Sequence, residues 1–253
     1  MKKFLLLFAI TKHAISYKNG KSNLFMNIRS FSSKHLPELY NAKTEGHKKY
    51  KYSLYNPSID LIICNGPAGS GKTSIACDYS IHQLKNKNFN KIIITRPTIS
   101  IQENLGYLPG TINEKMYPWT LPIFDIFHEY YTKNEVEIMI KEGMVEISPL
   151  GFIQGRTFKN AIIVADEMQN STNEQMYLLL TRLGNCSKMI VNGDLNQNKQ
   201  HNGLFDLMEK MKKKYNYEDN VDIMNEDGID FIELKDKDII RHKIVEKVIQ
   251  LYK

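Results

Sequence analysis

Eight consecutive residues have the spacing of a phosphate-binding loop, in which a first glycine is followed five positions later by Gly-Lys-Thr. They are Gly66, Pro67, Ala68, Gly69, Ser70, Gly71, Lys72 and Thr73. A triphosphate needs several backbone N–H donors that point inward, and glycine lets the chain wrap this closely. The apolar run before the loop predicts a strand, and the residues after it predict a helix whose positive end faces the anion. We therefore expect a nucleoside-triphosphate site rather than a chance glycine-rich turn, with Lys72 on the β- and γ-phosphates and the Thr73 hydroxyl on Mg²⁺.

A pair of carboxylates, Asp166 and Glu167, follows the apolar run 161–165. Mg²⁺ favours carboxylate oxygen, and an aspartate at the carboxyl end of a buried strand faces the crevice where phosphates bind. Glu167 is placed to accept a proton from an attacking water, which favours a hydrolase over a small-molecule kinase. A solvated strand end is the alternative for such a pair alone, and the phosphate loop earlier in the chain favours the functional interpretation.

The elements that must position these residues alternate along the chain, which predicts an α/β fold with a mostly parallel sheet and helices on both faces. Strands are predicted at 60–65, 91–95, 145–148, 161–167, 188–192 and 230–234, and helices at 48–55, from the loop to 85, 123–140, 173–183, 203–213 and 236–252. The glycines and prolines between 98 and 122 predict a long loop there, and residues 216–228 are predicted to be a polar excursion.

Further motifs occur in a fixed order around the loop and the carboxylate pair. They are Thr95-Arg96-Pro97, Leu105-Gly106-Tyr107-Leu108-Pro109-Gly110, Gly155-Arg156-Thr157, Asp166-Glu167-Met168-Gln169-Asn170, Leu180-Thr181-Arg182-Leu183-Gly184, Gly193-Asp194-Leu195-Asn196-Gln197 and Arg241-His242. This set resembles the PhoH family of phosphate-starvation-linked ATPases, whose members look like one core domain of a superfamily 1 helicase. The resemblance runs from about residue 42 to 253.

The resemblance implies a RecA-like P-loop NTPase core in which the strand of the carboxylate pair (the Walker B strand) is not adjacent to the strand of the phosphate loop (Walker A). It also implies Mg²⁺-dependent ATP binding and hydrolysis, coupled to remodelling or unwinding of RNA. The partners implied are single-stranded RNA and further copies of the chain in a homo-oligomeric ring. The alternative is a nucleotide-regulated assembly or binding module that hydrolyses slowly and has no motor activity.

Individual roles follow from the same resemblance. Gln197 corresponds to a sensor of the γ-phosphate, and Arg241 to an arginine finger that acts on a neighbouring subunit's nucleotide. Arg96 and Arg156 correspond to contacts with a nucleic-acid backbone, with internal ion pairs as an equal alternative for both and for Arg182. His47 stands where a glutamine would read adenine, and because histidine cannot make the paired amide contact, selectivity for adenine is weakened. The tyrosines and Trp119 are more typical of packing residues than of a base-stacking surface.

Charge is distributed unevenly along the 253 residues. The net charge is +6, but seven lysines and arginines precede the first acidic residue, Glu38, so the rest carries −1. A nucleic-acid surface must therefore be a local patch. Residues 1–37 are predicted to be a targeting leader, with a mitochondrial transit peptide favoured over another organelle, and the cytoplasm is the alternative. The domain is predicted to span 42–253.

The remaining composition excludes some classes of protein. The apolar run 4–10 is too short to cross a bilayer and no later run is longer and uncharged, so no membrane span is predicted. Cys64, Cys77 and Cys186 lack metal-ligand spacing, which predicts buried thiols in a reducing compartment rather than a zinc site or a disulfide.

Overall fold

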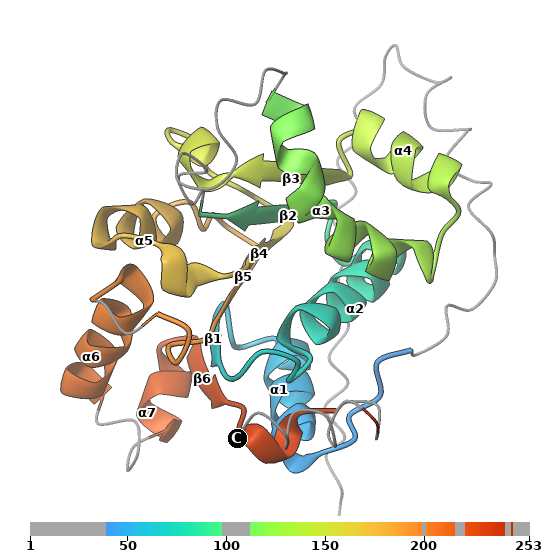
Figure 1. Cartoon of the computed structure of the whole chain (residues 1–253). Helices are drawn as coiled ribbons and strands as arrows, with labels where there is room; N and C mark the ends of the chain where they lie inside the picture. The colour runs from blue at the N-terminus through green and yellow to red at the C-terminus, as the bar shows by residue number, and fades with distance from the viewer. Residues whose placement is uncertain (1–38, 98–111, 199–200, 216–220, 241–243, 245–253) are drawn as a thin grey trace, which may run out of the picture. The chain divides into compact units, whose positions relative to one another are not determined.

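A computed structural model describes residues 39–97, 112–198, 201–215, 221–240 and Ile244. The predicted leader, the motif at 105–110, Arg241 and most of the predicted last helix lie outside these residues. The described chain is built on a six-stranded sheet (Figure 1). Its strands are β1 (Leu61–Asn65), β2 (Lys91–Arg96), β3 (Val145–Pro149), β4 (Ala161–Ala165), β5 (Lys188–Gly193) and β6 (Ile229–Glu233).

The strand order is β3-β2-β4-β5-β1-β6, and every neighbouring pair is parallel. This confirms the predicted α/β class and the separation of the two signature strands, because β5 lies between β1 and β4. Every residue of β4 and β5 is buried, as expected for strands covered on both faces. Parallel strands end at the same edge, so β1, β4 and β5 bring the residues that follow them to one edge of the sheet.

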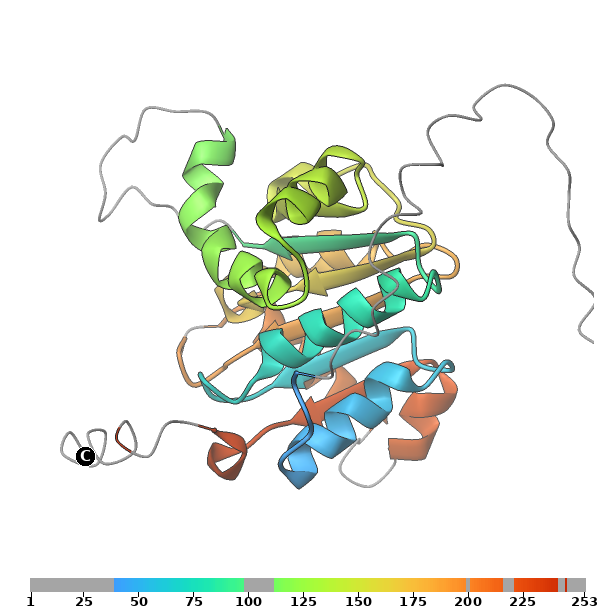
Figure 2. The ribbon, with the colours of Figure 1, turned by 90° about the vertical axis from the view of Figure 1, so that its right-hand side faces the viewer.

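Helices cover both faces of the sheet, as predicted. One face carries α1 (Glu45–Tyr55), α2 (Lys72–Lys85), α3 (Ile112–His128) and α4 (Lys133–Lys141), which lie in front of the strands in Figure 2. The other carries α5 (Asn173–Leu180), α6 (Gly203–Tyr215) and α7 (Val221–Glu226) (Figure 1). Three short 3₁₀ turns complete the described structure, η3 (Leu150–Ile153), η4 (Met168–Asn170) and η5 (Asp236–Asp238).

The predicted loop between 98 and 122 is wrong at its carboxyl end, because α3 begins at Ile112 and contains Pro118 and Pro122. Each proline lacks a backbone N–H and so removes one hydrogen bond of the helix. Pro118 and Pro122 are four residues apart and lie on the same side of the helix, so both hydrogen bonds are missing from that side. The helix changes direction along its length (Figure 2), as proline-containing helices do. Ile123 and Phe127 are buried and hold its second half against the rest of the domain.

The single helix predicted over 123–140 is two helices. The chain leaves α3 after His128, and α4 begins behind Thr132, whose hydroxyl accepts a hydrogen bond from the Glu135 N–H at 3.3 Å. The Glu135 carboxylate in turn accepts one from the Thr132 N–H at 2.8 Å. This capping box satisfies two donors that would otherwise have no partner, and its Thr-x-x-Glu spacing was present in the sequence.

Three smaller predictions near the end of the chain also need correction. The predicted polar excursion contains α7, whose Met224 is buried in the core. The helix predicted from Asp236 is replaced at its start by η5 and by non-helical residues 239–240. Cys64 and Cys77 are buried as predicted, whereas Cys186 is exposed. No helix among the described residues is both long and apolar enough to cross a membrane.

An ion-pair cluster fastens the outer strand β3 to its neighbours. Lys91 of β2 contacts the Glu146 carboxylate at 2.7 Å, and Arg156 binds both oxygens of the same carboxylate, one of them at 2.9 Å. Of the two roles considered for Arg156, the internal ion pair is therefore present. The hydrogen bonds from Arg156, followed by Lys91, lower the pKa of Glu146 from 4.5 to about 2.

The depressed pKa makes the contribution of Glu146 to stability dependent on pH. The folded protein keeps this carboxylate charged to about pH 2, whereas the unfolded chain protonates it near 4.5, so the stabilisation is present above 4.5 and is lost as the pH falls toward 2. We expect Glu146→Gln to lower the free energy of unfolding by about 1–2 kcal/mol at pH 7 and by less at pH 3.5. Urea denaturation at both pH values measures this, with Glu137→Gln on the exposed face of α4 as the control. An equal loss at the two pH values would contradict the ion-pair explanation.

Candidate nucleotide-binding site

The predicted phosphate loop connects β1 to α2, as its sequence spacing indicated. Gly71 precedes the helix with φ 81° and ψ 9°, in the left-handed region that favours glycine. The N–H of Ile75 bonds the Gly71 carbonyl at 2.9 Å and closes the first turn. The loop therefore leads directly into the positive end of a helix of 14 residues.

The start of the loop is wedged between two strand ends. The Gly66 N–H donates to the Gly193 carbonyl at 3.1 Å. A Cβ atom on Gly66 would lie 2.7 Å from the Cβ of Leu234 and 2.9 Å from its carbonyl oxygen, closer than real Cβ contacts allow. Glycine is required here because the residue just beyond β6 packs directly on the backbone.

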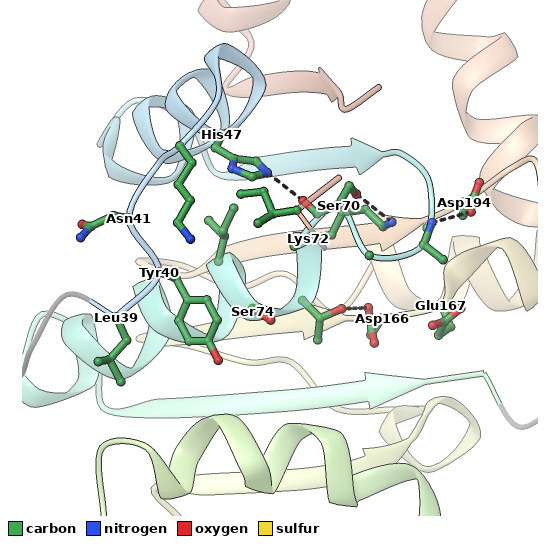
Figure 3. A pocket seen from close by; sticks show the side chains of 18 of the residues that line it. Leu39, Tyr40, Asn41, His47, Ser70, Lys72, Ser74, Asp166, Glu167 and Asp194 are labelled. Atoms are coloured by element: carbon green, nitrogen blue, oxygen red, sulfur yellow. Dashed lines mark hydrogen bonds between the residues drawn. The ribbon is translucent and has the colours of Figure 1, made fainter. Parts of the chain in front are cut away.

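Lys72 reaches back across the loop (Figure 3). Its Nζ donates to the carbonyl of Gly66 at 2.5 Å and to that of Pro67 at 2.9 Å. The ammonium group is thus held beside the loop, where the spacing of the motif predicts the β- and γ-phosphates to bind.

The fold brings together the two residues predicted to bind the metal, which come from two separate motifs. The Thr73 hydroxyl donates to Asp166 Oδ1 at 2.8 Å, although the two residues are 93 positions apart (Figure 3). Burial raises the pKa of Asp166, and the neighbouring Glu167 raises it further, while the Thr73 hydrogen bond, Arg96 and Lys72 act in the opposite direction. A buried carboxylate of this kind gains from a nearby cation.

Glu167 lies in an unusual backbone conformation, with φ 55°. This left-handed region is unfavourable for glutamate and is retained where surrounding contacts over-determine it. Two side chains hold the carboxylate: Arg96 Nη2 lies 3.1 Å from Oε1, and Gln169 Nε2 donates to Oε2 at 2.5 Å. The sequence suggested either a nucleic-acid contact or an internal ion pair for Arg96, and the ion pair is present in the structure.

Gln169 and Asp194 connect this carboxylate to the phosphate loop. Gln169 Oε1 accepts from the Asp194 N–H at 3.0 Å. Asp194 Oδ2 accepts from the Ala68 N–H at 3.1 Å and from Gln197 Nε2 at 2.8 Å. The predicted sensor Gln197 therefore reaches the site beside Asp194. Sequence reasoning gave Gln169 and Asp194 no role, although both stand within motifs that it identified.

His47 supports the loop from behind. Its ring is 2 % exposed, and Nε2 lies 2.9 Å from the Ser70 carbonyl (Figure 3). A carbonyl only accepts, so Nε2 carries the proton. Nδ1 is buried without a hydrogen-bond partner among the described residues. The predicted base-reading residue thus uses one ring nitrogen to hold the backbone of the loop.

Many of the residues of this site, His47 and Lys72 among them, line one cavity of about 470 Å³ (Figure 3). Residues 68–73 of the phosphate loop border the cavity, and so do Asp166, Glu167 and Gln197. Gly66 and Pro67, at the start of the loop, are not part of the lining. Tyr40, Asn41 and Lys43 line it as well, and no spacing in the sequence singled them out. Burial and a hydrogen bond to Glu129 raise the pKa of Tyr40 to about 12. Arg241, predicted to act across a subunit boundary, lies outside the described residues.

The site contains no closed cage of protein ligands for a metal. Within the described ranges, no three His, Cys, Asp or Glu side chains lie close enough together to hold an ion. The oxygen donors that converge at the site are the Thr73 hydroxyl and the Asp166 carboxylate.

Comparison with known proteins gives relatives over most of the chain. The family profile described as "PhoH-like protein" matches residues 40–253. A PhoH-like protein of Bacillus subtilis (strain 168) is 39 % identical over 210 residues, which cover 83 % of this chain and 63 % of the relative. One from Synechocystis is 33 % identical, covering 85 % and 62 %. Protein PhoH of Escherichia coli (strain K12) is 39 % identical, covering 62 % and 44 %. The chain thus spans about three fifths of the length of the first two relatives.

Solved structures resemble the chain more distantly. The SWI2/SNF2 ATPase core of Sulfolobus solfataricus in complex with dsDNA has a TM-score of 0.44 and 14 % identity, covering 82 % of this chain and 48 % of its own. Bacteroides Pif1 bound to ssDNA has a TM-score of 0.35 and 14 % identity, covering 84 % and 46 %. At this level of similarity the structures bear on neither substrate nor partner.

The contact between Gly66 and Leu234 gives a direct test of how the loop is held. Gly66→Ala places a methyl group against the Leu234 backbone and should lower the free energy of unfolding by about 1–3 kcal/mol and weaken binding of ATP. Urea denaturation and titration with a fluorescent ATP analogue measure the two effects. Gly151→Ala is the matched control, because its Cβ would meet nothing within 4 Å. Equal behaviour of the two variants would show that the close approach is unimportant.

Proposed function

The chain belongs to the PhoH-like protein family, and from that premise we propose that it binds ATP and hydrolyses it with Mg²⁺. Family membership and the phosphate loop support a nucleotide-binding function of the ATPase type. The observation that carries the finer proposal is the 2.8 Å hydrogen bond between Thr73 and Asp166. It joins the phosphate loop to the carboxylate pair at one edge of the sheet, and Glu167 is the residue next to Asp166.

The loop and Lys72 are proposed to bind the phosphates. Backbone N–H groups at the start of α2 point toward the anion, and the Lys72 ammonium adds a full positive charge. Lys72 is held by neutral carbonyls of Gly66 and Pro67, so a phosphate can replace these partners with a stronger, charge-assisted bond. The substrate then lies in the cavity bordered by Asp166 and Glu167.

Thr73 and Asp166 are proposed to hold Mg²⁺. Their oxygens are hard donors, and proteins bind Mg²⁺ through one or two such side chains together with the phosphates of the substrate. When bound, Mg²⁺ neutralises charge on the β- and γ-phosphates. The raised pKa of Asp166 fits a carboxylate whose burial is balanced by a cation.

Glu167 is proposed to be the general base. A water molecule attacks the γ-phosphorus, the bond from phosphorus to the bridging oxygen breaks, and the Glu167 carboxylate accepts the proton of the water. Gln169 fixes one carboxylate oxygen, and Gln197 lies beside Asp194 at the position expected to sense the γ-phosphate.

Replacing the base tests this assignment. In the full chain, Glu167→Gln should bind ATP as the wild type does while turnover falls about 10²- to 10³-fold, because the amide cannot take the proton. Phosphate release measures turnover, a fluorescent ATP analogue measures binding, and EDTA should abolish turnover of the wild type. Glu137→Gln serves as the control. Full turnover by Glu167→Gln would remove the base from the proposal.

We further propose that hydrolysis is coupled to single-stranded RNA. Support comes from three exposed or partly exposed groups. The Arg96 side chain at the end of β2 is 29 % exposed, Phe152 in η3 is 57 % exposed, and Tyr177 on α5 is 72 % exposed. Cations that bind phosphate and aromatic rings that stack on bases are the chemistry of single-strand recognition.

ATP turnover measured with and without RNA separates this proposal from the alternative, a nucleotide-regulated binding module without motor activity. A 20-nucleotide oligo(U) should raise the ATP turnover of the full chain several-fold, and the effect should weaken as salt is raised. If RNAs of different sequence and structure leave turnover unchanged, a nucleotide-regulated binding module is favoured instead. Light scattering with ATP and with ADP then tests whether such a module changes its assembly state.

A further inference from the structure

The two groups that hold the Glu167 carboxylate differ in how firmly they are fixed. Gln169 is 1 % exposed, and its amide oxygen is bound by the Asp194 N–H. The Arg96 side chain is 29 % exposed, and among the described residues its ion-pair partner is Glu167. One holder is therefore locked into the core, whereas the other borders solvent and can exchange its partner.

The Arg96 contact bears on the proposed chemistry because it occupies the reacting carboxylate. A general base must direct an oxygen lone pair at the attacking water. Gln169 already donates to Oε2, and the guanidinium lies 3.1 Å from Oε1. While both contacts are made, water competes with a charged donor for Oε1. Releasing Arg96 leaves Glu167 oriented by Gln169 and frees that oxygen.

Exposed aromatic side chains occur on the elements that follow β3, the strand paired with β2. Arg96 is the last residue of β2 and pairs with Pro149, the last residue of β3. The turn η3 follows Pro149 directly, and its Phe152 is exposed. α5, which packs against η3, exposes Tyr177. An arginine on β2 and exposed aromatic rings on these elements suit single-stranded nucleic acid, whose phosphates bind arginine and whose bases stack on aromatic rings.

We propose that Arg96 is a gate on Glu167. Its ion pair restrains the base, and a backbone phosphate of single-stranded nucleic acid draws the guanidinium away and releases the base for hydrolysis. Partly exposed ion pairs stabilise only weakly, so a phosphate can compete for the arginine. The inference rests on the proposed ATP hydrolysis, and it explains how nucleic acid bound at the carboxyl edge of β2 would accelerate chemistry at the end of β4.

Turnover of Arg96→Gln tests the gate. Without nucleic acid, this variant should hydrolyse ATP about three- to tenfold faster than the wild type, and oligo(U) or oligo(dT) of 20 nucleotides should accelerate it no further. The wild type should be accelerated by a similar factor when oligonucleotide is added. Arg96→Lys keeps the cation and should retain part of the restraint. Lys210→Gln, which removes the same charge from an exposed pair on α6, should behave as the wild type.

Binding provides a second readout that needs no turnover. Coupling between two sites is reciprocal, so removing the charge of Glu167 should free Arg96 for phosphate. Glu167→Gln should bind fluorescent oligo(U) about three- to tenfold more tightly than the wild type, and Arg96→Gln more weakly, as measured by fluorescence polarisation. Parallel titration with oligo(dT) shows whether RNA and DNA act alike.

The outcomes separate the gate from the proposed function. Slower turnover of Arg96→Gln with and without oligonucleotide means that Arg96 only supports Glu167, and the gate is overturned. If Arg96→Gln turns over ATP faster than the wild type but neither oligonucleotide changes the turnover of the wild type, nucleic acid is not the trigger. A wild type without any hydrolysis overturns the proposed function, and in that case unchanged oligonucleotide affinity of Glu167→Gln overturns the gate independently.

Discussion

The hydrogen bond between Thr73 and Asp166 depends on where three strands end. Thr73 follows β1 and Asp166 follows β4, and the two strands are not neighbours, since β5 lies between them. The side chains must therefore span the width of β5 at the edge of the sheet. Gly193, the last residue of β5, and Asp194, the next residue, lie at this edge and bond Gly66, Ala68 and Gln169. The residues at the end of β5 thus connect the phosphate loop, which follows β1, to the carboxylate pair, which follows β4.

This arrangement makes the nucleotide site a continuous polar network rather than a set of separate residues. A path of polar contacts runs from Arg96 through Glu167, Gln169 and Asp194 to the phosphate loop. It has a buried centre at Gln169 and a partly exposed end at Arg96. A change at the exposed end can therefore reach the loop through a contiguous network of hydrogen bonds and an ion pair, which is one physical route by which two sites couple.

The sequence allowed the parallel sheet, the phosphate loop and the carboxylate pair to be predicted, because each depends on local apolar runs and fixed spacings. The break before α4 was also encoded locally, in Thr132 and Glu135, but an apolar pattern that continues across it favoured a single helix. Pro118 and Pro122 favoured a loop because the packing of Ile123 and Phe127, which offsets their lost hydrogen bonds, depends on tertiary structure. The pairing of Arg96 with Glu167 and the contact of His47 with Ser70 join distant residues, and no spacing predicts them.

The packing of Leu234 on Gly66 has a consequence for how the protein is made. Of the six strands that the structure describes, β1 is synthesised first, whereas both of its neighbours, β5 and β6, follow the other three. The phosphate loop therefore reaches its final shape only after Leu234 has emerged, long after the loop itself has been synthesised. Closing contacts over such sequence distances is slow, so a chaperone that shields the apolar β1 during this interval would protect the nascent protein from aggregation.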